Sequence, residues 1–453
     1  MTTSHSEPTV VLSIETAARE LDSKVVLAAA LAGRGCRVVV AHKEAATAIA
    51  ARSRRVVWHG KSLFAVRGSD HLADRLAANG SAIMFMSDEG ALYQAAGWGP
   101  AILQKHWVGH FAGRRLDRLC VWGRRQGELI AGHLPEAAGA IAVTGSARFD
   151  LCLPEYAWIT DPIRDDRYPG KPFVLVCTRF GSIAHANGPA APFAARLNAE
   201  AWPTSVAEAE IGDVWFRKWR RDVHDFAEFT VFIRELATTY PTNEIVVRPH
   251  PSESLDFYRG AFAALKNIRV ERGGSLLGWM RAAAVVVHSG STSGVEATLA
   301  ERPVVNFLPD EGRGDDDIEV AREAGVTVHS RKDAVDAVAR LLADGAPPQS
   351  WSDRAKDVLE NLDHPAIPRL VEETMAVLRE DKIDASELVL PRESPLRTSV
   401  RRWTGRSDTY VEGKRGLLDA GHIERILAGC AERHIGGGRI ARSQPHWVVI
   451  SPP

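Results

Sequence analysis

Two polar segments directly follow apolar runs, and both have the composition of a loop that binds an anion. The first comprises Ser289, Gly290, Ser291, Thr292 and Ser293. It comes after the apolar run 284–288 and leads into a predicted helix that carries Glu296. Small residues at a helix N-terminus offer backbone N–H groups and hydroxyls to a phosphate, and Glu296 can accept hydrogen bonds from ribose hydroxyls. The alternative is a capped helix start whose small residues allow close packing.

In the second segment, Arg248 ends the predicted strand 244–248 and His250 lies in the loop that follows. Pro249 and Pro251 restrict the backbone on both sides of His250, so its imidazole is held in an extended loop. We expect Arg248 and His250 to contact a phosphate or a nucleoside. A lone histidine without a ligand is the alternative.

The elements that must position these residues form two series of short apolar strands alternating with helical patterns. This rhythm is typical of parallel sheets with helices on their faces. The strands of the first series are expected at 9–14, 36–41, 55–58, 82–86, 118–122 and 140–144. Those of the second series are expected at 173–177, 244–248, 268–271, 284–288, 303–307 and 326–329.

The sequence therefore predicts an α/β protein with two Rossmann-like domains that face each other across a cleft. The first domain is expected at 8–150 and the second at 171–375, joined by the Pro- and Asp-rich linker 151–170. No fold is assigned to the tail 376–453. Since ligands bind at the carboxyl ends of such strands, Glu15, Glu89 and Asp150 belong to the first domain's side of the cleft.

The charge balance, the cysteines and the hydropathy of the sequence indicate which partners and which compartment to expect. The 56 Lys and Arg residues balance 57 Asp and Glu residues, so no basic field favours nucleic acid. The five cysteines are dispersed, without zinc-like spacing, as in a reducing compartment. With no signal-like N-terminus and no run of about 18 apolar residues, we expect a cytoplasmic protein that can associate peripherally with the inner face of a membrane.

The Arg248–Glu253 and Val287–Ala297 segments resemble the His-Pro and Ser/Thr-rich motifs of bacterial surface-polysaccharide glycosyltransferases, which include Kdo and sialic-acid transferases. The resemblance is strongest to surface carbohydrate biosynthesis proteins that are similar to retaining β-Kdo transferases. It extends over about residues 9–310 and includes segments 15–21, 87–90, 143–150 and 303–307. Ser87 and Ser146-Ala147 depart from the family pattern.

The resemblance implies a GT-B glycosyltransferase that uses a CMP-sugar and needs neither a metal nor a cofactor. His250 and the 289–293 segment would hold the CMP phosphate and ribose. Asp150 is the predicted nucleophile and Glu89 the predicted acid/base, although Asp150 can instead cap a neighbouring segment. Arg179 is a further candidate for the donor's phosphate or carboxylate. The acidic run 315–317 is interpreted as a solvated loop rather than a metal site.

The implied reaction is transfer of Kdo or a related ulosonic acid to a glycan or glycolipid acceptor, in the biosynthesis of a capsule or lipopolysaccharide. Three alternatives remain open. One is a CDP-polyol phosphotransferase, whose motifs are related. The second is a nucleotide-sugar epimerase, which has a similar two-domain form and needs no acceptor. The third is a binding subunit without activity.

Overall fold

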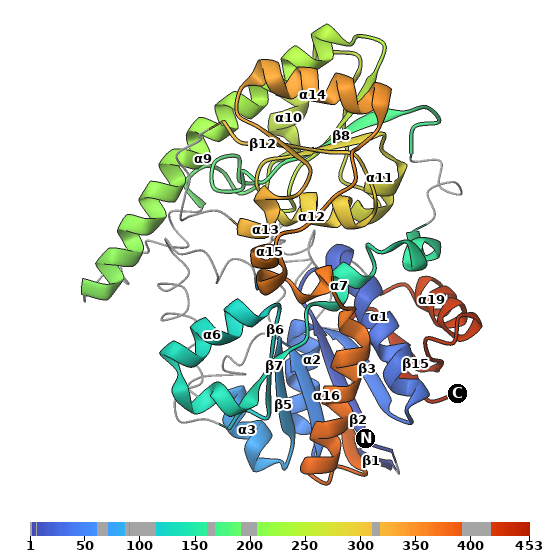
Figure 1. Cartoon of the computed structure of the whole chain (residues 1–453). Coiled ribbons are helices and arrows are strands. Elements are labelled where there is room, and N and C mark those ends of the chain that lie inside the picture. Colours follow the sequence, from blue (N-terminus) through green and yellow to red (C-terminus); the bar gives the residue numbers. More distant parts are fainter. Residues whose placement is uncertain are drawn as a thin grey trace, which may run out of the picture. The chain divides into compact units, whose positions relative to one another are not determined.

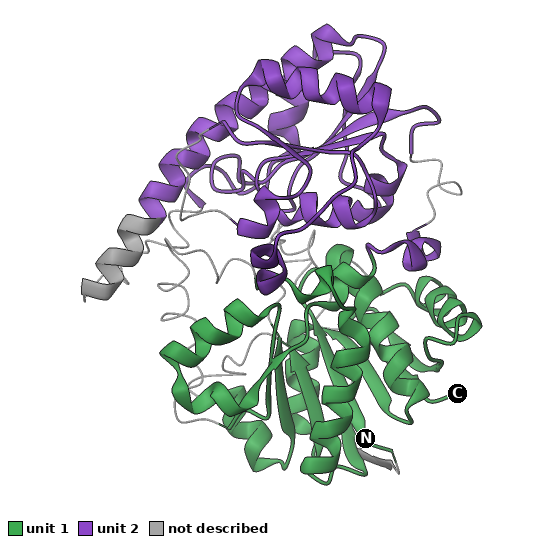
Figure 2. Cartoon of the chain, viewed as in Figure 1, with its two compact units in different colours: residues 1–90, 103–151, 359–453 green, residues 91–102, 152–358 purple. Residues whose placement is uncertain are grey.

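The computed structural model describes residues 2–5, 7–60, 71–86, 90, 115–160, 168–191, 206–309, 318–391 and 418–453, with side chains left out for 2–5 and 206–214. The chain forms two compact units. Figure 2 shows the first unit, residues 1–90, 103–151 and 359–453, in green, and the second, residues 91–102 and 152–358, in purple.

The first unit is built on one sheet in the order β15-β16-β3-β2-β4-β5-β6-β7. Strands β2 to β7 are parallel, and β16 joins the edge antiparallel to β3. Chain order reverses between β2 and β4, which makes this the switch point of the sheet. The strands are β2 (Thr9–Ile14), β3 (Arg37–His42), β4 (Val56–Gly60), β5 (Ala82–Met86), β6 (Arg118–Val121), β7 (Ile141–Val143), β15 (Arg439–Gln444) and β16 (Trp447–Ser451).

Helix α1 (Ala17–Gly33) is buried almost all round, because α16 (Ala366–Glu380) and α19 (Ala420–Glu432) pack against it. In Figure 1, α1 and α16 lie side by side on one face of the sheet. The remaining elements of this unit include α2 (Lys43–Arg52), α3 (Leu72–Ala78), α6 (Arg124–His133), α7 (Ala147–Asp150) and the pair β1 (Thr2–His5) and β14 (Ser386–Val389).

The second unit contains an all-parallel sheet in the order β10-β9-β8-β11-β12-β13, whose switch point lies between β8 and β11. Its strands are apolar on both faces because helices cover both. The strands are β8 (Phe173–Cys177), β9 (Glu244–Arg248), β10 (Ile268–Val270), β11 (Val285–His288), β12 (Val304–Phe307) and β13 (Val326–Val328).

Helices α9 (Val206–Thr239), α10 (Leu255–Ala261) and α14 (Arg331–Asp344) pack on one face of this sheet, and α11 (Leu276–Ala282) and α12 (Thr292–Leu299) on the other. The unit also holds α13 (Glu319–Arg322), α15 (Asp353–Val358) and the 3-10 helix Pro154–Thr160. Among the described helices, none combines the length and apolar character needed to cross a bilayer.

Both predicted series of strands are present, and their bounds differ from the expected ones by a residue or two. The domain limits need correction. The second unit ends at residue 358 rather than 375, and it begins at 152, so most of the expected linker belongs to it. Residues 359–453 return to the first unit, where β16 pairs with β3. Local pattern could not reveal this, because the pairing joins segments about 400 residues apart in sequence.

Candidate functional site

The loops after β8 and β11 diverge at the switch point of the second sheet, and one side chain joins them. Arg179 lies in the loop after β8, and Ser289 begins the turn after β11. The Nε of Arg179 donates a hydrogen bond to the backbone carbonyl of Ser289. Because ligands of open α/β sheets bind at such a point, this pair marks the candidate site.

The turn after β11 is shaped by two buried side chains beneath it. The amide of Gly290 donates to Oδ1 of Asn306 at 2.9 Å, and the amide of Ser291 donates to Nδ1 of His288 at 3.1 Å. Burial lowers the pKa of His288 to about 4, so the ring is neutral. With Nδ1 accepting, Nε2 carries the proton and lies 3.3 Å from the carbonyl oxygen of Ala324.

Backbone conformation requires glycine at one position around this turn, and close packing requires it at another. Gly290 has φ of +59°, in the left-handed region that favours glycine. Gly294, in the first turn of α12, lies directly over His288, where an added Cβ would be 2.1 Å from Nε2 of the imidazole. The two glycines therefore bring the N-terminus of α12 down onto the end of β11.

Hydrogen-bonding groups at the N-terminus of α12 remain available to a ligand. Ser291 is the N-cap residue, and its side chain makes no capping bond but bonds to Oγ of Ser293 instead. The hydroxyl of Ser289 is fully buried and has no hydrogen-bond partner within the described part of the chain. A buried unsatisfied hydroxyl is costly, and an oxyanion at this helix N-terminus would satisfy it.

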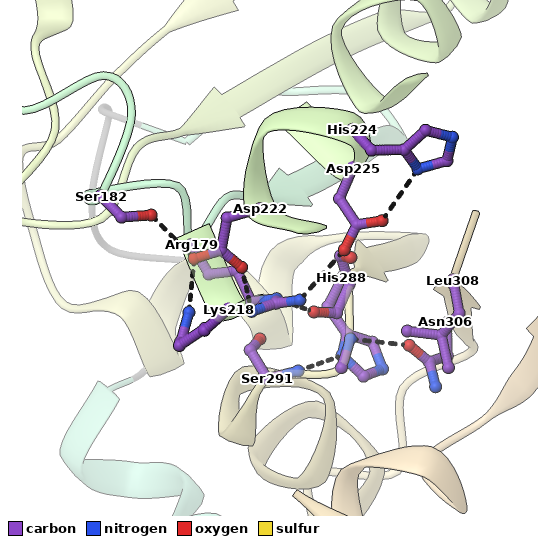
Figure 3. Close-up of polar contacts among 12 residues, drawn as sticks. Arg179, Ser182, Lys218, Asp222, His224, Asp225, His288, Ser291, Asn306 and Leu308 are labelled. Atoms are coloured by element: carbon purple, nitrogen blue, oxygen red, sulfur yellow. Dashed lines mark hydrogen bonds and ion pairs between the residues drawn. The ribbon is translucent and has the colours of Figure 1, made fainter. Parts of the chain in front are cut away.

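Helix α9 adds charged residues that the sequence alone did not single out (Figure 3). The guanidinium of Arg179 lies 3.4 Å from Asp222 and 3.4 Å from Asp225, both buried. Asp222 also accepts hydrogen bonds from Ser182 at 2.7 Å and from Lys218. Burial raises the pKa of Asp222, but Lys218 and Arg179 outweigh it and lower the pKa to about 2. The spacing of Asp222 and Asp225 on one helix face was the available signal.

His250 presents one ring nitrogen as a donor. Its Nδ1 accepts from the amide of Ser252 at 3.2 Å and lies 2.7 Å from the Ser252 hydroxyl. The proton of a neutral ring is therefore on Nε2. The side chain is half-buried, and its predicted contact with a phosphate or a nucleoside stays a prediction.

The His250 loop is anchored by Glu253, which is fully buried. Its carboxylate accepts from the hydroxyl of Thr178 at 2.6 Å, the amide of Phe180 at 2.7 Å and the hydroxyl of Tyr258. Burial raises the pKa of Glu253 to about 7, although these hydrogen bonds favour the carboxylate. Glu253 thus joins the His250 loop to the loop that carries Arg179.

Arg248 and Glu296 lie nearer the core than the sequence suggests. The guanidinium of Arg248 donates to the carbonyls of Gly273 and Gly274 at 2.5 and 3.2 Å and stacks on Trp279. These contacts hold the loop after β10. Glu296 is 8% exposed. Burial raises the pKa of Cys177, at the end of β8, to about 12; the charge of Arg248 opposes this shift and that of Glu296 adds to it. Neither side chain contacts Arg179 in the described structure, and their binding roles stay predictions.

The predicted catalytic carboxylates belong to the first unit. Asp150 is fully buried and accepts hydrogen bonds from Asn361 at 2.6 Å and from the amides of Ala366 and Ile367 at 2.8 and 2.7 Å. These are the contacts of a residue that caps the N-terminus of α16. Glu89 and the run 315–317 lie outside the described residues. The catalytic roles of Asp150 and Glu89 stay predictions.

No protein-family model matches the sequence, and none of the curated proteins matches it either. The structure is similar to that of the wall teichoic acid polymerase TagF soaked with CDPG, with a TM-score of 0.51 and 10% identity over 83% of this chain and 89% of TagF. It also matches the UDP-GlcNAc 2-epimerase of Methanocaldococcus jannaschii in complex with UDP-GlcNAc and UDP, with a TM-score of 0.44 and 11% identity over 81% of this chain and 99% of that chain.

The likeness to TagF, together with two Rossmann-like units each built on a parallel sheet, shows the fold. At this level of identity the likeness carries no residue from one protein to the other. The chain has the GT-B fold.

Proposed function

We propose that the chain is a glycosyltransferase that takes its sugar from a CMP-sugar, with the nucleotide phosphate bound at the switch point of the second sheet. The observation that carries this proposal is the open N-terminus of α12 beside the Arg179 guanidinium, with the buried Ser289 hydroxyl lacking a partner in the described structure. Phosphate is the ligand that suits this combination of helix dipole, hydroxyls and guanidinium.

The donors at this turn suit a single phosphate. The amides of Gly290 and Ser291 already bond to Asn306 and His288, which leaves the helix start and the hydroxyls as donors. Arg179 supplies a fixed positive charge, and its contacts with Asp222 and Asp225 are long enough at 3.4 Å to be exchanged for a phosphate oxygen. CMP carries one phosphate, whereas CDP and UDP carry two.

The nature of the sugar follows from the resemblance of the Arg248–Glu253 and Val287–Ala297 segments to enzymes that use CMP-activated ulosonic acids. Kdo and related sugars carry a carboxylate, for which the Nε2 donor of His250 is a suitable contact. The acceptor is a glycan or glycolipid of the cell surface. Peripheral attachment to the inner face of the membrane would bring a cytoplasmic enzyme to such an acceptor.

The chemical step needs a carboxylate at the anomeric carbon and a group that manages the acceptor proton. Asp150 and Glu89 are the predicted pair. Because Asp150 caps α16, it could act as the nucleophile only if its carboxylate gave up the hydrogen bonds from the amides of Ala366 and Ile367. Glu89 is therefore the first carboxylate to replace when transfer activity is measured.

Isothermal titration with CMP, CDP and UDP tests the nucleotide assignment. We expect CMP to bind tightest, and Ser293→Ala to weaken its binding about 10-fold, the effect of one hydrogen bond to a charged group. Ser330→Ala is the matched control, because Ser330 caps α14 in the same unit. Equal binding of the three nucleotides would contradict the proposal.

Product analysis separates the related activities. Incubation with CMP-Kdo and a glycan acceptor is expected to release CMP only when the acceptor is present. Tighter binding of CDP than CMP would instead indicate a CDP-polyol phosphotransferase. Conversion of a nucleotide sugar without any acceptor would indicate an epimerase.

A further inference from the structure

The exposed large hydrophobic side chains of the described part of the chain gather on two neighbouring helices. Phe216, Val223 and Val231 lie on α9 and Phe257 lies on α10, and each is between 37% and 41% exposed. The two helices are in contact, since the ring centroids of Phe226 and Phe257 are 5.1 Å apart. Single exposed apolar side chains are common on protein surfaces, whereas a cluster of them marks an interaction site.

The apolar residues of α9 share one face of the helix, which we call its outer face. At about 100° of rotation per residue, Val223 and Val231 lie within about 60° of Phe216 around the axis, with the exposed Ala227 between them. The rise of about 1.5 Å per residue makes this stripe about 22 Å long. The ring of Phe216 packs edge-on against that of the buried Trp215, which fixes one end of the stripe. Figure 1 shows α9 along the outside of the second unit.

The acidic residues of α9 are directed away from the outer face. From residue 215 onward the helix carries four carboxylates, and each pairs with an arginine of the same unit. The pairs are Asp222 and Asp225 with Arg179, and Glu228 and Glu235 with Arg331 of α14. Their negative charges are therefore compensated within the second unit.

Two arginines of α9 lie on the outer face itself. Arg220 is rotated by about 40° from Phe216 and Arg234 by about 0°, so both lie among the exposed apolar residues. Both are exposed, and neither forms an ion pair within the described part of the chain. From residue 215 onward, the outer face therefore combines apolar side chains with positive charge and no negative charge.

We propose that the outer face of α9 binds a membrane surface that contains anionic lipids. The apolar side chains enter the boundary between headgroups and acyl chains, and the two arginines pair with lipid phosphates. A lipid surface adapts to a convex helix, whereas a protein partner needs a complementary groove. A second copy of the chain fits the charge less well, because two-fold packing of this face would oppose Arg220 and Arg234 to the same residues.

This surface would hold the enzyme at the lipid that carries its acceptor. That consequence rests on the proposed function, in which the acceptor is a glycan or glycolipid. Binding of the outer face to lipid follows from its own apolar residues and charges and does not depend on the donor.

Co-sedimentation of the full chain with vesicles tests the charge and the apolar stripe separately. The vesicles are phosphatidylcholine alone and equal parts of phosphatidylcholine and phosphatidylglycerol. We expect binding to the mixed vesicles that weakens as salt is added, and little binding to pure phosphatidylcholine. Arg220→Gln and Arg234→Gln should each weaken binding about 5-fold. The double variant Phe216→Ser, Val223→Ser should weaken it at least about 10-fold.

Controls separate lipid binding from misfolding. Arg52→Gln removes an exposed arginine from α2 of the first unit and should bind vesicles like the wild type. The outer-face variants should keep the melting temperature of the wild type and its affinity for CMP, because the exchanged side chains are exposed.

A fluorescent label on the helix gives a readout that identifies the binding face. All five cysteines are buried, so a single introduced exposed cysteine can be labelled selectively. An environment-sensitive fluorophore on Val223→Cys should shift to shorter wavelength with the mixed vesicles. The same label on Glu128→Cys, at a side chain that is 61% exposed on α6 of the first unit, should not shift.

The outcomes distinguish the lipid surface from its alternatives and from the donor site. Equal binding to both kinds of vesicle, or no shift of the label at position 223, would refute the proposal. Self-association without lipid that Phe216→Ser abolishes would assign the outer face to a second copy of the chain and overturn the lipid assignment. If CMP fails to bind but the mixed vesicles still shift the label, the lipid surface stands and the proposed function fails.

Discussion

The Nε of Arg179 donates a hydrogen bond to the carbonyl oxygen of Ser289, and this one contact ties the loop after β8 to the turn after β11. The two loops leave adjacent parallel strands at the switch point of the second sheet. The remaining N–H groups of Arg179 face Asp222 and Asp225 of α9, so a single guanidinium connects three elements around the candidate phosphate site.

Replacing Arg179 tests its role in nucleotide binding. Arg179→Met should raise the Kd for CMP by about 10- to 100-fold, because a charge-assisted contact to phosphate is lost. Arg179→Lys should recover part of the affinity, since it keeps the charge but not the planar guanidinium. Arg217→Met, an exposed change on α9, is the control and should bind like the wild type in isothermal titration. An unchanged Kd in Arg179→Met would exclude Arg179 from the site.

Glu253 should make the stability of the second unit depend on pH. The pKa of Glu253 is raised from 4.5 to about 7 in the folded state. Its contribution to the free energy of unfolding is therefore fully present below pH 4.5 and is lost as pH rises through 7. The shift corresponds to about 3 kcal/mol. Urea unfolding of the wild type and Glu253→Gln at several pH values should therefore show their difference in free energy changing across this window.

The control for Glu253 is Glu128→Gln on the exposed face of α6, which should leave the pH dependence of unfolding unchanged. Parallel pH profiles for the wild type and Glu253→Gln would show that Glu253 does not titrate between pH 4.5 and 7.

Asp150 is expected to matter first for stability. Asp150→Ala leaves three donors of residues 361, 366 and 367 without their acceptor and should cost about 2 to 4 kcal/mol in thermal or urea unfolding. Asp419→Ala removes the exposed N-cap of α19 and should cost only about 1 kcal/mol.

A measurement of sugar-transfer activity decides whether Asp150 also acts as the nucleophile. If Asp150 only caps α16, Asp150→Asn should retain transfer per folded molecule. Complete loss of transfer in a variant that melts like the wild type would instead identify Asp150 as the nucleophile.

Gly294 is expected to be intolerant of a side chain. A Cβ at this position would lie 2.1 Å from Nε2 of His288, so Gly294→Ala must displace either α12 or the imidazole that supports the Ser291 amide. We expect a marked fall in melting temperature together with weaker CMP binding. Gly132→Ala on α6 has open space around the added methyl and should be neutral or slightly stabilising. Equal melting temperatures of the two variants would contradict this packing.

Periodicity along the chain was sufficient to predict the two series of strands, because each buried strand of a parallel sheet is a short apolar run between polar turns. It also singled out the 289–293 turn, since a Ser/Thr/Gly run after such a strand has few structural uses. Both signals are local in sequence, and a single sequence therefore carries them.

Only the tertiary structure decided which of the polar residues share a site. Arg248 precedes a proline-restricted loop, yet its guanidinium turns to the carbonyls of Gly273 and Gly274. Asp150 became a cap for α16 because residues more than 200 positions away return to the first unit. Arg179, Asp222 and Asp225 meet because α9 packs beside β8 and β11. These contacts join segments far apart in sequence, and nothing in the local pattern of either segment specifies its partner.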